Sequence, residues 1–590
     1  MKQYFQSLQL TLFLLLFVVS SHATNNESIV SFSVQGGFYD TSFNLTLSCP
    51  ENLIIHYTLN GDTPTIQDAV YSQPLFLDEK LYSKSSIYTI QTCSDESWYV
   101  PETIIRCIVI RAAAFDLDGN CVSSVTTNSY FIKSLGYKTH DLPVVSISCD
   151  SLALFDFETG IMVQGITGQN YNQHGRDWER LCNFEFYETD NQGINQQVGL
   201  RTHGDITRIG IQKGLKLYAR KEYGNKRFDY KFFETTKIHS FKHLVLKPAR
   251  FGQIRDHLCS QMSKSLNFEV PDSRPVVVFL NGTYWGLYFL KERPDAQFIA
   301  DHYGINNKNI NLIESWSGTI ADGDNQDFIK MMQWFMKADL TNDNEYQHAC
   351  SLIDVDCFID YYCFQLYTAN GDWPNNNMRC WQIGNGKWRW IFFDGDECLN
   401  SYPNMLANTI INKENTDIST LVFSKLLNNE DFRNHFYARF GHLLTNEFHP
   451  KHTKEYYYSC TKATENEIDT HFSRFGYLNL KNKYEFQLWF TETFLSYRMV
   501  SAASMVYQLY FYNGWTFNNS AASSQKQFKY NPDSRRPTFL LRMARQFKDW
   551  KYVRMYFAYE RFRIHHVMKA SKLGQSMKHS RLWRKLKGKP

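Results

Sequence analysis

Two short polar segments in the second half of the chain hold the residues best suited to chemistry. Residues 370–377 read Asn-Gly-Asp-Trp-Pro-Asn-Asn-Asn, and residues 394–396 read Asp-Gly-Asp. Asp372 and Asn377 are five positions apart, a spacing at which one loop offers both a proton acceptor and a metal ligand for phosphoryl transfer. Asp394 adds a carboxylate, and Mg²⁺ prefers such hard oxygen ligands. We therefore expect Asn377 and Asp394 to converge on one divalent ion.

The elements around these segments are predicted to position them. A helical pattern over 356–367 leads into the first segment. Residues 378–382 and 387–393 are predicted to pair as a hairpin across Gly384-Asn385-Gly386, and its second strand ends at Asp394. The alternative is that both segments are ordinary solvated turns, because Asp, Asn and Gly are common turn residues.

Upstream of these segments the pattern is mixed α/β. Alternating strands are predicted at 198–203 and 214–220, a further strand at 244–247, a helix at 253–266, and a hairpin formed by 276–280 and 285–290. Helices follow at 327–337 and 356–367, with several more between 417 and 510. This order of strands, helix, hairpin and helical region is the order of a protein-kinase fold, so we expect an α+β fold class.

Several motifs in this region resemble the CotH (spore coat protein H) kinase family, and they occur in the order of that family. They are LPVVSI (142–147), GLRTHGDITRIGIQKGLKLYARKEYG (199–224), VFLNGTYWGLYFLKER (278–293), NGDWPNNN (370–377) and WIFFDGDE (390–397). The resemblance covers about residues 142–510 and implies an atypical two-lobe protein-kinase-like domain. It further implies transfer of the γ-phosphoryl group of ATP to Ser or Thr of a secreted protein, with Mg²⁺ or Mn²⁺. On this resemblance Asp372 is the catalytic aspartate, Asp394 binds metal, and Asp396 supplies a second carboxylate.

The same resemblance nominates residues that contact the nucleotide. The basic motif of the family matches residues 212–217, so Lys213 or Lys216 is expected to neutralise the ATP phosphates. Lys216 is preferred, because its neighbours Leu215 and Leu217 indicate that it faces away from the core. The order of strands in kinases would instead nominate Lys247, and a solvated strand lysine is the alternative for each.

Two further positions in the strand-rich part deserve a prediction. Glu292 matches a family glutamate just past the hairpin, where a kinase hinge would hold the adenine. The loop from Gly204 to Gly210 departs from the family pattern, since it retains Gly204 and Thr207 but introduces Asp205. An acid at that position would repel ATP phosphates unless it binds metal.

The N-terminal part is built differently. Residues 29–133 contain short period-two runs separated by turn residues, which predicts about seven strands and an immunoglobulin-like β-sandwich. The segments IHYTLNGDTPT (55–65), YSQPLFL (71–77) and IVIRAAAFDLDGNCVSSVTTNSYFI (108–132) resemble the chitobiase/β-hexosaminidase C-terminal module. That resemblance implies an accessory module near a sugar polymer, with no chemistry of its own. A linker is expected at 133–142, followed by the kinase-like domain at 142–510.

The first residues predict the compartment. Lys2, an apolar run over 8–19 and the small residues Ser21 and Ala23 are typical of a secretory signal peptide at 1–23. A short buried helix is the alternative. No later stretch is long enough for a membrane span. We therefore expect a secreted or extracytoplasmic protein, in a periplasm or at a cell surface.

The cysteine count of 13 is odd and admits two interpretations. Four cysteines within the first 130 residues could form one or two bridges, or the thiols could serve as small buried apolar side chains. A zinc site is poorly supported, because no CxxC or paired histidine motif accompanies them.

The formal net charge of +4 conceals an uneven distribution. Residues 541–590 contain 15 Lys and Arg against two acids, a net charge of +13, so residues 1–540 carry −9. A basic aromatic extension is therefore predicted at 511–590. It is either a solvated tail or an adhesive segment for an anionic membrane, wall polymer or acidic partner. Nothing in the overall charge indicates nucleic acid.

Three functions remain open from the sequence. The first is a secreted kinase that acts on an extracytoplasmic protein. The second is a catalytically weak or inactive kinase-fold scaffold of the cell surface or polysaccharide layer, since secreted compartments contain little ATP. The third is a glycoside hydrolase, suggested by the chitobiase-like module, although Asp394 and Asp396 are too near in sequence to define its geometry.

Overall fold

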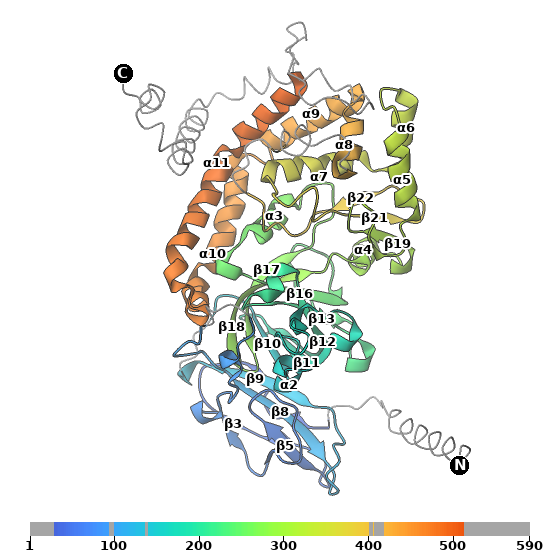
Figure 1. Ribbon diagram of the computed structural model, residues 1–590. Coiled ribbons are helices and arrows are strands. Elements are labelled where there is room, and N and C mark those ends of the chain that lie inside the picture. Colours follow the sequence, from blue (N-terminus) through green and yellow to red (C-terminus); the bar gives the residue numbers. More distant parts are fainter. Residues whose placement is uncertain (1–28, 94–98, 136–139, 400–404, 406–417, 512–590) are drawn as a thin grey trace, which may run out of the picture. The chain divides into compact units, whose positions relative to one another are not determined.

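The computed structural model describes residues 29–93, 99–135, 140–399, 405 and 418–511 (Figure 1). The predicted signal peptide at 1–23 and all but the first residue of the predicted extension at 511–590 lie outside these residues. Among the described helices, none is both long and apolar enough to cross a membrane.

The chain divides into two compact units, each assembled from separate segments. Within the described residues, the first unit comprises those up to Gly252, Ser273–Arg293 and Ala463–Lys481. The second unit comprises Gln253–Asp272, Pro294–Lys462 and the residues from Asn482. Helix α10 (Pro450–Phe475) contributes residues to both.

The N-terminal part of the first unit is β-rich, as expected. A five-stranded sheet has the order β2-β9-β8-β5-β6, and two strand pairs, β1–β4 and β3–β7, accompany it. The core of this part draws residues from the sheet and from both pairs, including Leu45, Leu47, Ile108 and Ile110. The strands are β1 (Ser31–Phe32), β2 (Gly37–Tyr39), β3 (Asn44–Leu45), β4 (Leu47–Ser48), β5 (Ile54–Thr58), β6 (Ala69–Val70), β7 (Leu75–Phe76), β8 (Ile108–Phe115) and β9 (Thr126–Ile132).

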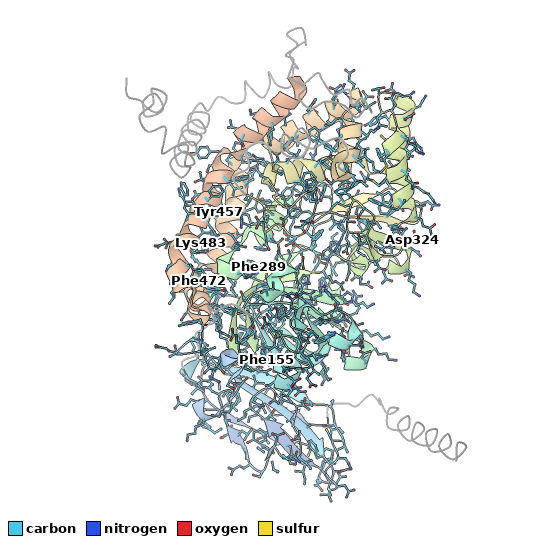
Figure 2. All side chains as sticks on the ribbon, viewed as in Figure 1. Phe155, Phe289, Asp324, Tyr457, Phe472 and Lys483 are labelled. Carbon is cyan, nitrogen blue, oxygen red and sulfur yellow. The ribbon has the colours of Figure 1, made fainter. Side chains whose placement is uncertain are left out.

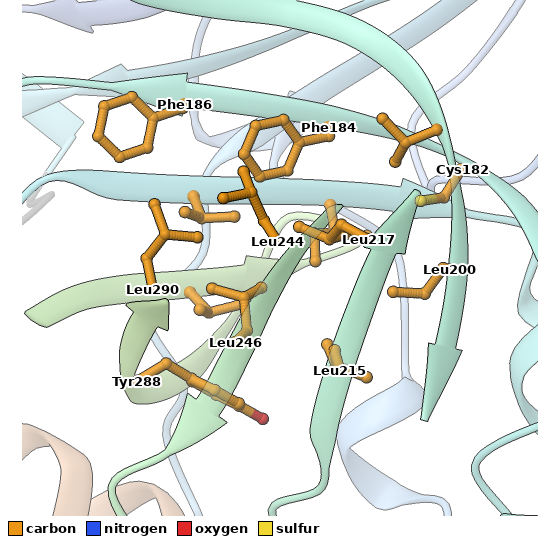
Figure 3. Close-up of a cluster of buried hydrophobic side chains, with 14 of the residues drawn as sticks. Cys182, Phe184, Phe186, Leu200, Leu215, Leu217, Leu244, Leu246, Tyr288 and Leu290 are labelled. Atoms are coloured by element: carbon orange, nitrogen blue, oxygen red, sulfur yellow. The ribbon is translucent and has the colours of Figure 1, made fainter. Parts of the chain in front are cut away.

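The rest of the first unit is organised around a closed seven-stranded barrel of order β10-β11-β12-β13-β16-β18-β17. Alternate side chains of each strand fill its interior, where Leu215, Leu217, Leu244 and Leu246 pack together (Figure 3). Phe155, at the end of α2 (Ser151–Phe155), packs against this core (Figure 2). The barrel strands are β10 (Val144–Cys149), β11 (Arg180–Tyr187), β12 (Gly193–His203), β13 (Gly214–Tyr218), β16 (His243–Pro248), β17 (Ser273–Leu280) and β18 (Thr283–Glu292), and a separate pair is formed by β14 (Phe228–Asp229) and β15 (Ser240–Phe241).

A buried carboxylate joins the N-terminal sheet to the barrel. Glu185 of β11 is fully buried and accepts hydrogen bonds from the backbone N–H and hydroxyl of Ser129 in β9, at 2.9 and 2.5 Å. The hydroxyl of Tyr187 donates a third, at 2.5 Å. Burial raises the pKa of Glu185 to about 7, because desolvation outweighs these bonds to the charged form.

The predicted hairpin is present as β17–β18, and it turns at a buried asparagine. Asn281 adopts a left-handed backbone with φ of 46°, and Gly282 follows with φ of 73°. The Asn281 side chain accepts from the backbone N–H of Cys149 and donates to its carbonyl, both at 2.8 Å. Its role is therefore to close the hairpin against the end of β10.

The second unit is mainly helical, with one small antiparallel sheet of order β20-β19-β21-β22. The predicted hairpin is confirmed, because Cys380 pairs with Trp390 and Trp381 with Arg389. Its strands are β19 (Ile310–Ile313), β20 (Ile320–Asp322), β21 (Arg379–Ile383) and β22 (Arg389–Ile391). The other helices are α3 (Arg255–Ser263), α4 (Ala296–Tyr303), α5 (Gln326–Lys337), α6 (Asp343–Leu352), α7 (Val355–Thr368), α8 (Leu421–Leu426), α9 (Glu430–Thr445) and α11 (Lys481–Phe511).

Helix α7 is the central element of the second unit. Every side chain from Cys357 to Thr368 is buried, and Asp354 caps the N-terminus by accepting from the backbone N–H of Cys357 at 3.0 Å. Asp360, 2% exposed, forms a two-armed ion pair with Arg439 of α9 at 2.6 and 2.8 Å. This pair fixes the rotation of α7, and with it the direction in which the next loop leaves the helix.

Candidate functional site

The loop after α7 carries the first group of predicted site residues. The helix ends at Ala369, which adopts a left-handed backbone with φ of 53°. Asn370 is buried, and its amide nitrogen donates to the side chain of Gln365 at 3.0 Å while its amide oxygen accepts from the backbone N–H of Asp372 at 3.2 Å. A buried asparagine thus fixes the first turn of the loop and leaves the Asp372 side chain exposed.

Asn377 connects this loop to the turn that follows β22. Its amide nitrogen donates to the Asp372 carboxylate and to the backbone carbonyl of Asp394, both at 3.4 Å. Asn377 itself has φ of 55°, a left-handed conformation that asparagine tolerates better than most residues. The structure therefore brings together Asp372, Asn377 and Asp394, the three residues that the sequence placed in two separate segments.

The turn at Asp394 is held from the other side by α3. Asp394 also has a left-handed backbone, with φ of 59°. The backbone N–H of Gly395 donates to the carboxylate of Asp256 at 2.8 Å, and Asp256 is 5% exposed. A second link joins the two segments, since the Gly371 N–H donates to the carbonyl of Glu397 at 3.0 Å.

Negative charge accumulates where these segments meet. The pKa of Asp372 is raised from its ordinary value, chiefly by partial burial and then by the charges of Glu397 and Asp394. Two neighbouring carboxylates thus oppose ionisation of the third. A divalent cation would relieve this repulsion, and an elevated pKa suits a group that must accept a proton.

The donor chemistry fits a hard cation. Asp372, Asp394 and Asn377 offer carboxylate and amide oxygens, the ligand class of Mg²⁺ and Mn²⁺. Asp396, half-buried, lies two residues beyond Asp394 in the same turn. Within the described residues no cluster of three or more His, Cys, Asp or Glu side chains is arranged to hold a metal ion, so the described arrangement is not a closed cage of such ligands.

The first unit presents basic residues on the outer face of the barrel. Leu215 and Leu217 point into the core (Figure 3), and the intervening Lys216 lies on the opposite face of β13, as the alternation predicts. Lys216 stands opposite Arg201 of β12 and Val245 of β16. Lys247 lies on the same face of β16, opposite Phe289 of β18.

The positive charge of this face affects the pKa of one histidine, His203. The pKa of His203 is lowered well below its ordinary value, first by burial and then by Lys216, Lys247, Arg293 and Arg208. His203 is therefore a neutral imidazole at neutral pH. The face acts as a patch of cations built on adjacent strands, which is the kind of surface that attracts phosphate groups.

Lys213 is placed quite differently from Lys216. It is fully buried, and its ammonium donates to the carbonyls of Thr92, Arg208 and Gly210 at 2.7, 2.7 and 3.1 Å. The ring of Tyr171 lies 4.3 Å from its nitrogen. Burial lowers the pKa of Lys213 to about 7. All three donors of the Lys213 ammonium are engaged within the first unit.

The loop 204–210 is shaped by a glycine and an arginine. Gly204 has φ of 108°, and a Cβ at this position would lie 2.1 Å from the hydroxyl of Thr207. Arg208, 3% exposed, donates to the carbonyls of Gly204 and Tyr171 at 2.6 and 3.3 Å. Asp205 is exposed at the start of the short 3-10 helix Ile206–Ile209, and no side-chain hydrogen bond from it caps that helix.

Glu292 lies at the end of β18, where it is 4% exposed and stands opposite Leu244 of β16. The geometry does not assign it a chemical role beyond this position in the barrel.

Two residues of the carboxylate site were not among the predicted site residues. Glu397 directly follows Asp394-Gly395-Asp396, so its proximity in sequence was a usable signal. Asp256 lies about 140 residues upstream in α3, and no spacing rule connects it to the turn that it holds.

The comparisons with known proteins agree with the two resemblances. Residues 34–127 match the family described as chitobiase/beta-hexosaminidase C-terminal domain. A comparison with curated proteins found no match. Residues 200–501, slightly more than half of the chain, match the family described as CotH kinase protein and include every candidate site residue described above. The chain therefore belongs to the CotH kinase protein family.

Proposed function

We propose that the protein is an atypical Ser/Thr kinase that transfers the γ-phosphoryl group of ATP to an extracytoplasmic protein, with Mg²⁺ or Mn²⁺ as the cofactor. The observation that carries this proposal is the linkage of Asp372, Asn377 and Asp394 through the Asn377 amide. In a kinase these three residue types supply the proton acceptor and the metal ligands. Membership of the CotH kinase family supports the same chemistry.

Asp372 is proposed to accept the proton of the acceptor hydroxyl as the oxygen attacks phosphorus. Its exposed side chain is accessible to a substrate, and partial burial together with the charges of Glu397 and Asp394 raises its pKa, which makes it a stronger base than an isolated aspartate. Asn377 holds the Asp372 carboxylate and so orients it for the proton transfer.

Asp394 and Asn377 are proposed to hold the divalent ion, with Asp396 as a further ligand. The ion would neutralise phosphate charge and so favour departure of ADP. The left-handed turn at Asp394 and the bond from Gly395 to Asp256 keep this carboxylate in place before any ligand binds.

Lys216 is proposed to bind the ATP phosphates, in preference to Lys213. It lies among Arg201, Lys247 and Arg293 on the outer face of the barrel, whereas the donors of Lys213 already serve three carbonyls. Glu292 remains a proposed nucleotide contact from the family pattern alone. On this interpretation the barrel is the strand-rich lobe of the kinase, and the second unit is its helical lobe.

The setting of the reaction is proposed from the N-terminal region. The chitobiase/beta-hexosaminidase C-terminal domain suggests a polysaccharide or anionic surface as the place of action, and the predicted signal peptide suggests export. The substrate is then a secreted or surface protein. We also propose that residues 29–133 form the accessory module and residues 142–510 the kinase-like domain.

Nucleotide-dependent stabilisation of the full chain tests this proposal. We expect Mn²⁺ with ATP to raise the midpoint of thermal unfolding by several degrees, since a ligand that binds only the folded state stabilises it. Asp394→Asn should abolish the rise, because it removes a ligand charge while keeping a residue that tolerates the left-handed backbone. Exposed Asp324→Asn is the matched control and should keep the rise.

The alternative is a kinase-fold scaffold that does not bind ATP. The exposed acid Asp205 in the loop 204–210 is the observation that favours it. Absence of any Mn²⁺-ATP stabilisation in the wild-type chain would support the scaffold and overturn the kinase.

A further inference from the structure

Cys149 and Cys182 face one another on neighbouring strands of the barrel. They are register partners in the antiparallel pairing of β10 with β11, and both are fully buried in the barrel core. No disulfide joins any of the 13 cysteines in the structure. The distance between two such strands makes this pair a candidate for a covalent bond.

The backbone hydrogen bonds show which kind of antiparallel pair this is. The backbone N–H and carbonyl of Cys149 both bond to the side chain of Asn281, which lies beside β10 at the end of β17. The Asn281 N–H likewise donates to the carbonyl of Ile147, the residue two before Cys149, at 2.8 Å. The polar backbone groups of Cys149 therefore point away from β11, so Cys149 and Cys182 form a non-hydrogen-bonded pair.

Non-hydrogen-bonded pairs bring opposite residues closest together. Their Cα atoms lie about 4.5 Å apart, within the roughly 4.4–6.8 Å range that a disulfide spans. The two side chains also share one face of the sheet, since both belong to the core of the barrel. The Cys149 sulfur already lies against β11, where it donates to the carbonyl of Leu181 at 3.4 Å.

We propose that Cys149 and Cys182 form a disulfide that staples β10 to β11 when the chain folds in an oxidising compartment. The bond closes the segment between them, residues 150–181. The carbonyl of Tyr171 in that segment accepts hydrogen bonds from Thr202 and Arg208, and its ring lies against Lys213. The staple therefore restrains the segment that supports the loop 204–210. This proposal does not depend on the kinase function.

The bond forms by thiol–disulfide exchange with a low-molecular-weight disulfide such as oxidised glutathione. The Cys149 thiolate attacks one sulfur of glutathione disulfide, which forms a mixed disulfide and releases one glutathione thiolate. The Cys182 thiolate then attacks the Cys149 sulfur, which forms the Cys149–Cys182 bond and releases the second glutathione. Glutathione disulfide gains two electrons, and the two cysteine protons end on its two thiols. Because both sulfurs are buried in the fold, the exchange precedes closure of the barrel.

Peptide mapping of the full chain tests the proposal directly. The chain is folded in a mixture of reduced and oxidised glutathione, alkylated in denaturant without reduction, digested and analysed by mass spectrometry. We expect a cross-linked peptide that joins the Cys149 and Cys182 segments and is lighter by two hydrogens than its separate halves. Recovery of both cysteines in alkylated form would overturn the proposal. A link between Cys259 and Cys398, whose thiols are hydrogen-bonded in the second unit, has a different mass and is scored separately.

Thermal unfolding of variants provides a second readout. The oxidised wild type should unfold about 5–10 °C above the reduced form, because the bond restricts the unfolded chain. Cys149→Ala, Cys182→Ala and the double variant should lose this difference to the same extent. Cys363→Ala is the control, because Cys363 is a buried thiol whose neighbouring charges are Asp360 and Arg439 rather than another cysteine. An undiminished oxidised-to-reduced difference in Cys149→Ala would contradict the staple.

Discussion

The outer face of the barrel and the carboxylate loops of the second unit place charge by opposite means. On the barrel, Lys216 is directed outward because it alternates with two core leucines on a regular strand. In the second unit, Asp394 and Asn377 lie on turns with left-handed backbones and are held by hydrogen bonds from outside their own segments. The first arrangement follows from a periodic pattern, and the second depends on particular long-range contacts.

This difference predicts how each region responds to mutation. A charge on the barrel face is supported by a core that does not involve it, so its removal should affect binding without affecting the fold. In the loops, the same residues shape the turn and carry the charge. Substitutions there must preserve the backbone conformation if the chemistry is to be tested, which is why asparagine is the appropriate replacement for Asp394 and Asp372.

The largest expected effect is that of Asp372→Asn. It keeps the shape of the loop but removes the proposed proton acceptor, so phosphoryl transfer should slow by about 10²–10⁴-fold. Binding of Mn²⁺-ATP, measured by calorimetry, should persist. An undiminished rate would show that Asp372 is not the base and that the carboxylate loop has another role.

The stability of the first unit is expected to depend on pH. Burial raises the pKa of Glu185 to about 7, so between pH 4.5 and 7 the folded state binds more protons than the unfolded state. Stability should therefore fall as the pH rises through this window, by about 3 kcal/mol. Urea unfolding at a series of pH values measures it, and Glu185→Gln should remove this part of the slope. If the free energy of unfolding has the same pH slope in the wild type and in Glu185→Gln, the assignment is contradicted.

The two neighbouring lysines of the barrel should separate binding from stability. Lys216→Ala should weaken Mn²⁺-ATP binding by about 10-fold or more, the contribution of a charge-assisted contact, with little change in the denaturant midpoint. Lys213→Ala should instead destabilise the chain by about 2 kcal/mol, because it leaves buried carbonyls without their donor. If Lys213→Ala folds normally and abolishes binding, the assignment of the two lysines is reversed.

The smallest expected effect is a shift in pH dependence. Glu397→Gln removes one of the charges that raise the pKa of Asp372, so that pKa should fall. The acidic limb of the rate profile should then move to lower pH, while the rate at high pH stays close to that of the wild type. Glu430→Gln, which changes an exposed acid at the start of α9 in the second unit, should leave the profile in place. An unshifted profile in Glu397→Gln would mean that Glu397 does not act on the base.

The sequence predicted those parts of the molecule that follow from periodic patterns. The strands around Lys216, the hairpin that ends before Asp394 and the helix leading to Asp372 were all recognisable from alternation, helical spacing and turn residues. The contribution of Asp256 was not, because it depends on the packing of α3 against a turn about 140 residues later in the chain. The burial of Lys213 could not be predicted from the sequence either, because one of the carbonyls that accept from its ammonium is that of Thr92 in the N-terminal region.

The central claim is that this chain transfers phosphate from ATP. The most direct test incubates the full chain with Mn²⁺ and ATP labelled at the γ-phosphate, with its own hydroxyls and an added acceptor protein as possible substrates. We expect label to accumulate with time on Ser or Thr in the wild type and to be lost in Asp372→Asn. Binding of Mn²⁺-ATP without any transfer of label to protein would contradict the kinase and leave a nucleotide-binding scaffold in its place.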